Sequence, residues 1–202
     1  MGQVWTFIKS DFHRYRPIGG NRVKDALAIV AYALTARWPG FTYAFWWRIA
    51  SGHSPLRFLG RLMAWRLGKV YCIDLPPGTR VGHGLYLGHG MGLVVNRETV
   101  IGDNVNLSHF VSVGTNSSAP ATIGDNVYVG PNVSVVEDVV IGNDVTIGAG
   151  SVVTRDLPDG CTAVGVPCKP VNFNAPGRYI VNRWPPRPGE AARPSGGSPR
   201  RR

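Results

Sequence analysis

The segment from Ile123 to Val153 reads IGDNVYVGPNVSVVEDVVIGNDVTIGAGSVV, and an aliphatic residue returns in it at every sixth position. These anchor residues are Ile123, Val129, Val135, Ile141, Ile147 and Val153. A period of six predicts a triangular coil, in which three hexapeptides form one turn of about eighteen residues and the aliphatic residue points inward. Each flat side of such a coil is a short strand. The segment is therefore expected to form a parallel β-helix of hexapeptide repeats.

The six-residue period begins at Leu75 and is interrupted twice. The upstream anchors are Leu75, Val81, Leu87 and Leu93, followed after a two-residue slip by Val95, Ile101, Leu107 and Val113. A four-residue insertion then precedes Ile123. Because regular repeats only build the scaffold, functional side chains are expected at the interruptions. After Gly165-Val166-Pro167 the period ends, and residues 172–184, NFNAPGRYIVNRW, are expected to pack back on the coil.

Residues 1–72 lack the six-residue period and predict helices, because apolar residues recur there at helical spacing between Pro and Gly residues. The predicted helical segments are residues 4–16, 21–38, 41–51 and 54–71. The predicted domains are a small α-helical N-terminal domain over 1–72, the β-helix over 73–170, and an extension with a disordered basic tail over 171–202.

A membrane association is not favoured for the helical part. The longest apolar run, residues 26–36, is about half as long as a bilayer crossing requires. Trp46, Trp47, Arg61 and Arg66 are compatible with a helix that lies on a membrane surface. A helical cap or a subunit interface is the favoured interpretation, because such apolar stripes usually form packed cores.

Charge and cysteine content narrow the class of protein. The chain holds 22 Lys and Arg against 12 Asp and Glu, for a net charge of +10, and its last twenty residues contain six Arg and one Glu. No nucleic-acid-binding pattern accompanies this charge, so no nucleic-acid partner is expected. Three cysteines, Cys72, Cys161 and Cys168, in a chain with no expected signal peptide indicate reduced thiols and a cytoplasmic location.

Two histidines are predicted to stack on one edge of the coil. His89 and His109 each follow an anchor, Leu87 or Leu107, by two residues, and counting across the slip places these anchors one coil apart. Their side chains are therefore expected about 5 Å apart, one strand spacing. His83 falls in the preceding hexapeptide and on a different edge. A zinc site of these three histidines would need a contact across a subunit interface, so no metal is expected.

Residues 72–171 resemble the serine acetyltransferases and related hexapeptide O-acetyltransferases. The resemblance rests on the motif Ile-Asp-hydrophobic-x-Pro at 73–77, on Gly-hydrophobic-x-hydrophobic-x-His-Gly at 84–90, and on GAGSVVTRDLPDGCTAVGVPCKPV at 148–171. These motifs are far more specific than the hexapeptides. The resemblance implies a left-handed β-helix, acetyl-CoA as cosubstrate, and a homotrimer, with a hexamer as the alternative.

In the resembled family, the Asp of the first motif and the His of the second form a catalytic dyad, which corresponds to Asp74 and His89 here. A neutral imidazole can accept the proton of an acceptor hydroxyl while the carboxylate orients the ring. His109 is the candidate for a second histidine role. Because the hydroxyl attacks the thioester directly, Cys168 is expected to be a packing residue. The alternative is that Asp74 is a turn residue and His89 a polar edge residue.

The resemblance also implies a cofactor groove. The implied acetyl-CoA-binding residues are Gly148, Ala149, Gly150, Gly165, Pro167 and Lys169, with the lysine suited to a phosphate of CoA.

The acceptor loop departs from the family pattern. The insertion at 114–122, GTNSSAPAT, lacks the Arg and His that serine acetyltransferases carry there, and Gly88 stands where many of them have Asp. Serine is a zwitterion and needs charged partners, so a hydroxyl of a sugar in a surface polysaccharide is slightly favoured over L-serine, the alternative acceptor. Two rivals of other classes are a zinc-dependent carbonic-anhydrase-like β-helix and a non-catalytic scaffold. The sequence thus predicts an acetyl-CoA-dependent O-acetyltransferase.

Overall fold

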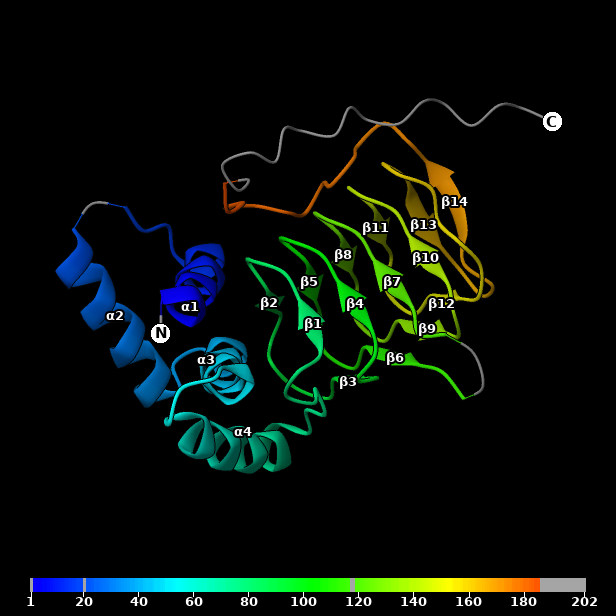
Figure 1. The fold of residues 1–202 in the computed structure, drawn as a ribbon. Coiled ribbons are helices and arrows are strands. Elements are labelled where there is room, and N and C mark those ends of the chain that lie inside the picture. The colour runs from blue at the N-terminus through cyan, green and yellow to red at the C-terminus, as the bar shows by residue number, and fades with distance from the viewer. Residues whose placement is uncertain (1, 20, 117–118, 186–202) are drawn as a thin grey trace.

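The computed structural model describes residues 2–19, 21–116 and 119–185, and Figure 1 shows a bundle of helices at one end of a β-helix. The helices are α1 (Gly2–Tyr15), α2 (Arg22–Thr35), α3 (Pro39–Ser51) and α4 (Arg57–Tyr71). The predicted helical segments are confirmed, except that Pro39 and Gly40 begin α3 instead of separating two helices. Proline fits there because the first residue of a helix needs no backbone donor. No helix within the described ranges is long and apolar enough to cross a membrane.

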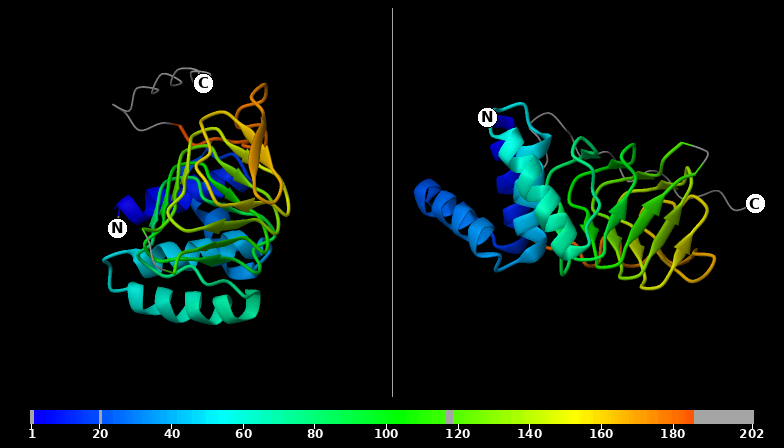
Figure 2. Two further views of the ribbon diagram at one scale, coloured as in Figure 1. Left: turned by 90° about the vertical axis from the view of Figure 1, so that its right-hand side faces the viewer. Right: turned by 90° about the horizontal axis from the view of Figure 1, so that it is seen from below.

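The β-helix is built from short strands. They are β1 (Arg80–Val81), β2 (Tyr86–Leu87), β3 (Val94–Val95), β4 (Val100–Ile101), β5 (Asn106–Leu107), β6 (Ser112–Gly114), β7 (Thr122–Ile123), β8 (Tyr128–Val129), β9 (Ser134–Val136), β10 (Val140–Ile141), β11 (Thr146–Ile147), β12 (Val152–Val153), β13 (Thr162–Val164) and β14 (Lys169–Asn172). Sheet 1 has the order β1-β4-β7-β10, sheet 2 the order β14-β13-β11-β8-β5-β2, and sheet 3 the order β12-β9-β6-β3. Figure 2 shows the stacked coils along their axis and from below. The predicted left-handed parallel β-helix with a helical N-terminal part is confirmed.

The predicted anchors stack above one another in the interior. Leu87 pairs with Leu107, Leu107 with Val129, and Val129 with Ile147. All four side chains are at most 2% exposed. The two-residue slip lies in the corner after β2 and the four-residue insertion in the corner after β6, so neither disturbs the stack. The register predicted across the slip is therefore confirmed.

A ladder of polar side chains joins successive coils at the corner between sheets 1 and 2. Asp125 Oδ1 accepts a hydrogen bond from the Asp103 N–H at 2.7 Å, and Asn143 Oδ1 accepts one from the Asp125 N–H at 2.9 Å. Asp159 Oδ1 continues the ladder by accepting from the Asn143 N–H at 2.7 Å. The Asp or Asn that recurs at this corner thus satisfies backbone donors that the short strands leave unpaired.

The first coil has no coil beneath it, and side chains of the helical bundle take that place. Arg48 donates to the carbonyl oxygens of Val81 and Gly82 at 2.9 and 2.6 Å, while Asp11 Oδ1 accepts from the Leu85 N–H at 2.8 Å. Arg48 Nε also donates to Asp11 Oδ2 at 2.8 Å. Burial raises the pKa of Asp11, and the adjacent Arg48 guanidinium opposes that rise. This buried pair fixes the bundle to the open end of the β-helix.

Residues 173–185, the C-terminal strap, run back along the β-helix toward the helices, as the orange segment in Figure 1 shows. The Gly177 N–H donates to the Asp144 carbonyl at 2.7 Å, and the Trp184 N–H donates to Asn104 Oδ1 at 2.8 Å. The prediction that this segment packs back on the coil is confirmed. The predicted disordered basic tail beyond residue 185 lies outside the described residues.

Candidate active site

One edge of the β-helix, between sheets 2 and 3, carries the predicted histidines. The rings of His89 and His109 lie edge to face, with centroids 5.2 Å apart and planes at 84°. Their stacking and their spacing are confirmed. His89 is exposed and His109 is half-buried. The two imidazoles thus form one polar surface at the end of the β-helix nearest the helices.

The same edge continues into the predicted cofactor residues. The Asn132 N–H donates to the His109 carbonyl at 3.1 Å, and the Gly150 N–H donates to the Pro131 carbonyl at 2.9 Å. Pro131 thus occupies the position above His109 that the repeat predicts, and the Gly150 corner follows one coil further. His89, His109 and the Gly150 corner therefore lie along a single edge.

The corner that holds His89 is shaped by the helical bundle. His89 has a φ of +61°, in the left-handed region that few residues other than glycine adopt. A Cβ on Gly90 would collide with the backbone of Gly40, which is the second residue of α3. The hydroxyl of Tyr15 donates to the Leu87 carbonyl and accepts from the Leu87 N–H, both at 3.0 Å. The bundle therefore holds the His89 backbone in an unusual conformation.

Sequence reasoning missed both of these supporting residues. The Pro39-Gly40 pair predicts a break between two helices, and the sequence carries no signal that Gly40 contacts the histidine corner. No sequence pattern points to Tyr15, because its partner Leu87 lies 72 residues further along the chain. Burial raises the pKa of Tyr15 well above its ordinary value, so its hydroxyl stays protonated and able to donate.

His109 keeps one ring nitrogen without a partner. Its Nδ1 atom is buried, and no group in the described part of the chain forms a hydrogen bond with it. The ring packs edge to face against both His89 and Phe110, the latter at a centroid distance of 5.4 Å. A buried polar atom of this kind is costly unless it is satisfied.

Asp74 lies beside the segment that follows His89. Its N–H donates to the Leu93 carbonyl at 2.7 Å, and its carbonyl accepts from the Val95 N–H at 2.8 Å. The carboxylate is exposed, and within the described residues no hydrogen bond or ion pair joins it to His89. The structure therefore places Asp74 near the histidine corner without forming the dyad, and the dyad stays a prediction.

The two groups of predicted cofactor residues meet through Ser151. Its hydroxyl donates to the Gly148 carbonyl at 2.8 Å and accepts from the Gly165 N–H at 3.1 Å. Ala149 and Gly150 are exposed, and a Cβ on Gly150 would meet no atom within 4 Å. The surface at this corner is thus open. Ser151 was not singled out from the sequence, although it directly follows the GAG motif.

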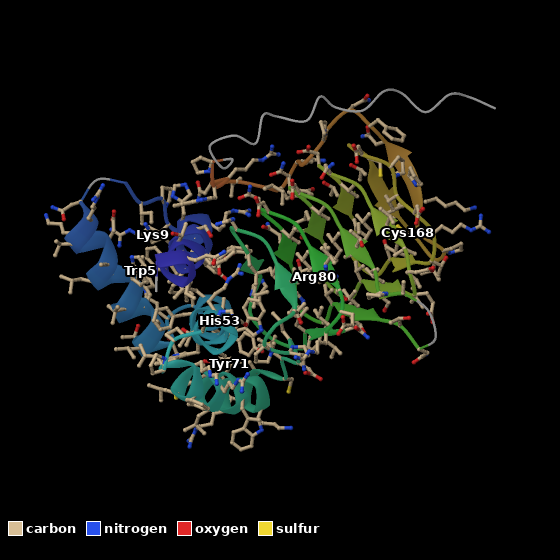
Figure 3. All side chains as sticks on the ribbon, viewed as in Figure 1. Trp5, Lys9, His53, Tyr71, Arg80 and Cys168 are labelled. Atoms are coloured by element: carbon tan, nitrogen blue, oxygen red, sulfur yellow. The ribbon has the colours of Figure 1, made fainter. Side chains whose placement is uncertain are left out.

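Pro167 and Lys169 lie next to this corner. A cis peptide bond precedes Pro167, and Lys169 is the exposed first residue of β14. Cys168 lies between them, and Figure 3 labels it at the end of the β-helix far from the helices. Burial raises the pKa of the Cys168 thiol, and it raises that of Cys161 to about 11. Both thiols are therefore protonated near neutral pH, as expected of packing residues.

His83 does not join the other two histidines within one chain. Its ring stacks on Phe7 of α1, with centroids 4.3 Å apart, and its Nδ1 atom lies 3.5 Å from the Asp103 carboxylate. No group of three metal-ligating side chains occurs among the residues that the structure describes. The position of His83 on a different edge is confirmed.

The chain is similar to known acetyltransferases in sequence. A family described as "Bacterial transferase hexapeptide (six repeats)" matches residues 120–155. The serine acetyltransferase of Helicobacter pylori strain J99 is 35% identical over 154 residues, which cover 73% of this chain and 90% of the relative. The serine acetyltransferase of Synechococcus elongatus is 34% identical over 136 residues, which cover 64% of this chain and 56% of the relative.

Solved structures show the same likeness. Neisseria gonorrhoeae serine acetyltransferase in complex with serine superposes with a TM-score of 0.67 and 30% identity, covering 84% of this chain and 70% of the other. The soybean serine acetyltransferase complexed with serine gives a TM-score of 0.68 and 28% identity, covering 85% of this chain and 70% of the other. With a shared fold and a relative that matches over 90% of its own length, the chain belongs to the serine acetyltransferase family and is an acyltransferase.

Proposed function

We propose that the protein transfers the acetyl group of acetyl-CoA to the hydroxyl of L-serine, the O-acetylation that precedes cysteine synthesis. The observation that carries this proposal is the single edge that runs from His89 and His109 to the Gly148 corner. The relatives are named serine acetyltransferases, and the Neisseria structure is a complex with serine. They support L-serine over the sugar acceptor that the loop composition slightly favoured, so we set the sugar aside.

In this proposal His89 is the general base. Its neutral imidazole accepts the proton of the serine hydroxyl as that oxygen forms a bond to the acetyl carbonyl carbon. It returns the proton to the sulfur of CoA as the carbon–sulfur bond breaks, so that the products are the serine ester and free CoA. Asp74 orients the ring and stabilises its protonated form. His109 supplies a hydrogen bond from its half-buried ring, which lies beside His89.

The residues at the far corner fit an extended thioester. The open surface at Gly150 accommodates a chain that passes close to the backbone, and Gly165 and Pro167 form the adjoining wall. Lys169 is exposed and suits a phosphate of CoA as a point charge. Bound acetyl-CoA supplies the activated acetyl group, while these residues position it toward His109 and His89.

The proposed assembly is a homotrimer. Exposed apolar side chains lie on the outer surfaces of sheets 1 and 3 and at the histidine edge, where subunits would meet: Met91, Val94, Phe110, Val136 and Val140. Light scattering should then give a mass near three times 21.9 kDa. A mass near six times that value would indicate the hexamer, and a monomer would contradict the proposal. The free cysteines support a reducing compartment, and we place the enzyme in the cytoplasm.

The test measures thiol release from acetyl-CoA by the purified full chain. L-serine and a panel of mono- and oligosaccharides are offered as separate acceptors, and a His89→Ala variant is the control. Release with L-serine that depends on His89 would support the proposal. Release with a sugar and not with L-serine would refute the acceptor, and no release with L-serine despite bound CoA would refute it as well.

A further inference from the structure

A cavity of about 600 Å³ lies between α4 and the segment that leads into the first coil. Arg61, Trp65 and Lys69 of α4 form one wall. Tyr43 of α3 and Asp74 line it as well. We call this site the α4 cavity. Its volume is in the range of small-molecule sites, and it contains the carboxylate that the resemblance assigns to catalysis.

The spacing of residues on α4 explains why the wall is basic. Arg61, Trp65 and Lys69 are four residues apart, so they share one face of the helix. Gly68 brings α4 close to the first coil, because a Cβ there would lie 2.7 Å from the Ile73 carbonyl oxygen. The helix therefore presents two long cationic side chains and an indole over the cavity.

The cations of this wall are not neutralised within the protein. In the described part of the chain, neither Arg61 nor Lys69 forms an ion pair, and Asp74 is the single carboxylate among the residues that line the cavity. Two positive charges thus face one negative charge. Such a site favours a ligand that carries an anionic group.

The α4 cavity adjoins the histidine corner through backbone hydrogen bonds. The part of the lining that leads into the first coil begins at Cys72, directly after Tyr71, which Figure 3 labels on α4. The Tyr71 carbonyl accepts from the Gly92 N–H at 2.9 Å. Asp74 donates in turn to the Leu93 carbonyl at 2.7 Å. The segment that follows His89 is therefore bonded through its backbone to the segment that lines the cavity, and Asp74 belongs to that lining.

We propose that the α4 cavity is the anion subsite for the acceptor, in which Arg61 and Lys69 bind the carboxylate of a small hydroxy acid. This inference rests on the proposed function, because it takes Asp74 and His89 to mark the reacting hydroxyl. The loop over 114–122 carries no cation, so the charge that a carboxylate requires must come from elsewhere. In this arrangement, α4 supplies that charge.

The test compares two neutralising variants with a matched control. Arg61→Gln and Lys69→Met remove the cavity cations, while Arg66→Gln removes an exposed cation of α4 that does not line the cavity. The acceptors are L-serine and L-serinamide, in which an amide replaces the carboxylate. We expect the KM for L-serine to rise about tenfold to a hundredfold in each cavity variant, the loss typical of a hydrogen bond to a charged group. The KM for acetyl-CoA and the rate with L-serinamide should not change.

The outcomes separate the subsite from the proposed function. If wild-type protein acetylates L-serine and both cavity variants behave like Arg66→Gln, the subsite is wrong and the proposed function stands. Calorimetric binding of L-serine and of glycerate provides a readout that is independent of turnover. Carboxylate binding that Arg61→Gln and Lys69→Met abolish would support the subsite even without serine acetylation, whereas no carboxylate binding to the wild-type protein would overturn it.

Discussion

The imidazoles of His89 and His109 lie edge to face, with ring centroids 5.2 Å apart, on one edge of the β-helix. The two residues come from successive coils and are held at this distance by the parallel pairing of β2 with β5. His109 Nδ1 is buried and has no hydrogen-bond partner within the described residues.

This relationship predicts unequal losses of activity. His89→Ala should lower kcat by about a hundredfold to ten-thousandfold, the usual contribution of a general base. His109→Ala should cause a smaller loss of about tenfold, because it removes one hydrogen bond near the reacting group. Steady-state kinetics at saturating acetyl-CoA measure both effects. Full activity of His109→Ala beside an inactive His89→Ala would exclude a role for His109.

The buried pair of Arg48 and Asp11 should dominate the attachment of the bundle to the β-helix. Arg48→Met leaves the Asp11 carboxylate buried without its partner, and about 3–5 kcal/mol of unfolding free energy should be lost. The double variant Asp11→Leu with Arg48→Met should recover a large part of that loss, since no charge is then left buried. Urea unfolding of the three proteins measures this difference. A double variant that is no more stable than Arg48→Met would argue against the pairing.

Ser151 should act on cofactor binding through the Gly148 corner. Ser151→Ala removes two hydrogen bonds of a buried hydroxyl, which link the Gly148 carbonyl to the Gly165 N–H. We expect a loss of stability of about 1–3 kcal/mol and a severalfold rise in the KM for acetyl-CoA. Thr154→Ala, at a nearby exposed position, is the control and should behave as wild type. An unchanged KM for acetyl-CoA in Ser151→Ala would remove the corner from the cofactor site.

The cysteines should differ in reactivity. Because the pKa of Cys161 is raised to about 11, about a thousandth of this thiol is thiolate at pH 8. The thiolate fraction then increases about tenfold per pH unit until the pH approaches the pKa. Cys72 is exposed and should be the first thiol to react with iodoacetamide in the folded protein. Peptide mass spectrometry identifies the labelled residue.

Cys168→Ala should retain acetyl transfer, because the acceptor hydroxyl attacks the thioester directly. Loss of the chemical step in that variant would instead indicate that Cys168 is a nucleophile.

The regular part of the fold could be predicted because its signal is local and repeated. Each hexapeptide places one aliphatic residue inside, so the pairing of Leu87 with Leu107 follows from counting along the chain, even across the slip. The same count places His89 beside His109 and places Pro131 in the next coil. The candidate cofactor residues rest on the family resemblance, which the contiguous motif that contains Gly148 makes recognisable, and they stay a prediction.

The acceptor side could not be predicted in the same way. The sequence places Arg61 on a helical cap, and only the position of α4 over the first coil brings Arg61 and Lys69 into the lining of a cavity with Asp74. The loop composition favoured a sugar because it lacked a cation, and the relatives favour L-serine instead. The absence of a cation from one loop does not decide the acceptor, because an element that is distant in sequence can bring a cation close to the site.

The period of six in this sequence thus specifies the coil, its core and the histidine edge, because those features depend on neighbours within one or two turns. The contacts that support the site join residues far apart in the chain. Arg14 donates to the carbonyl of Val181 at 2.9 Å and to Asn106 Oδ1 at 2.7 Å, linking α1, the C-terminal strap and the β-helix. No local pattern encodes such contacts, because they arise only when the packing of the bundle brings these segments together.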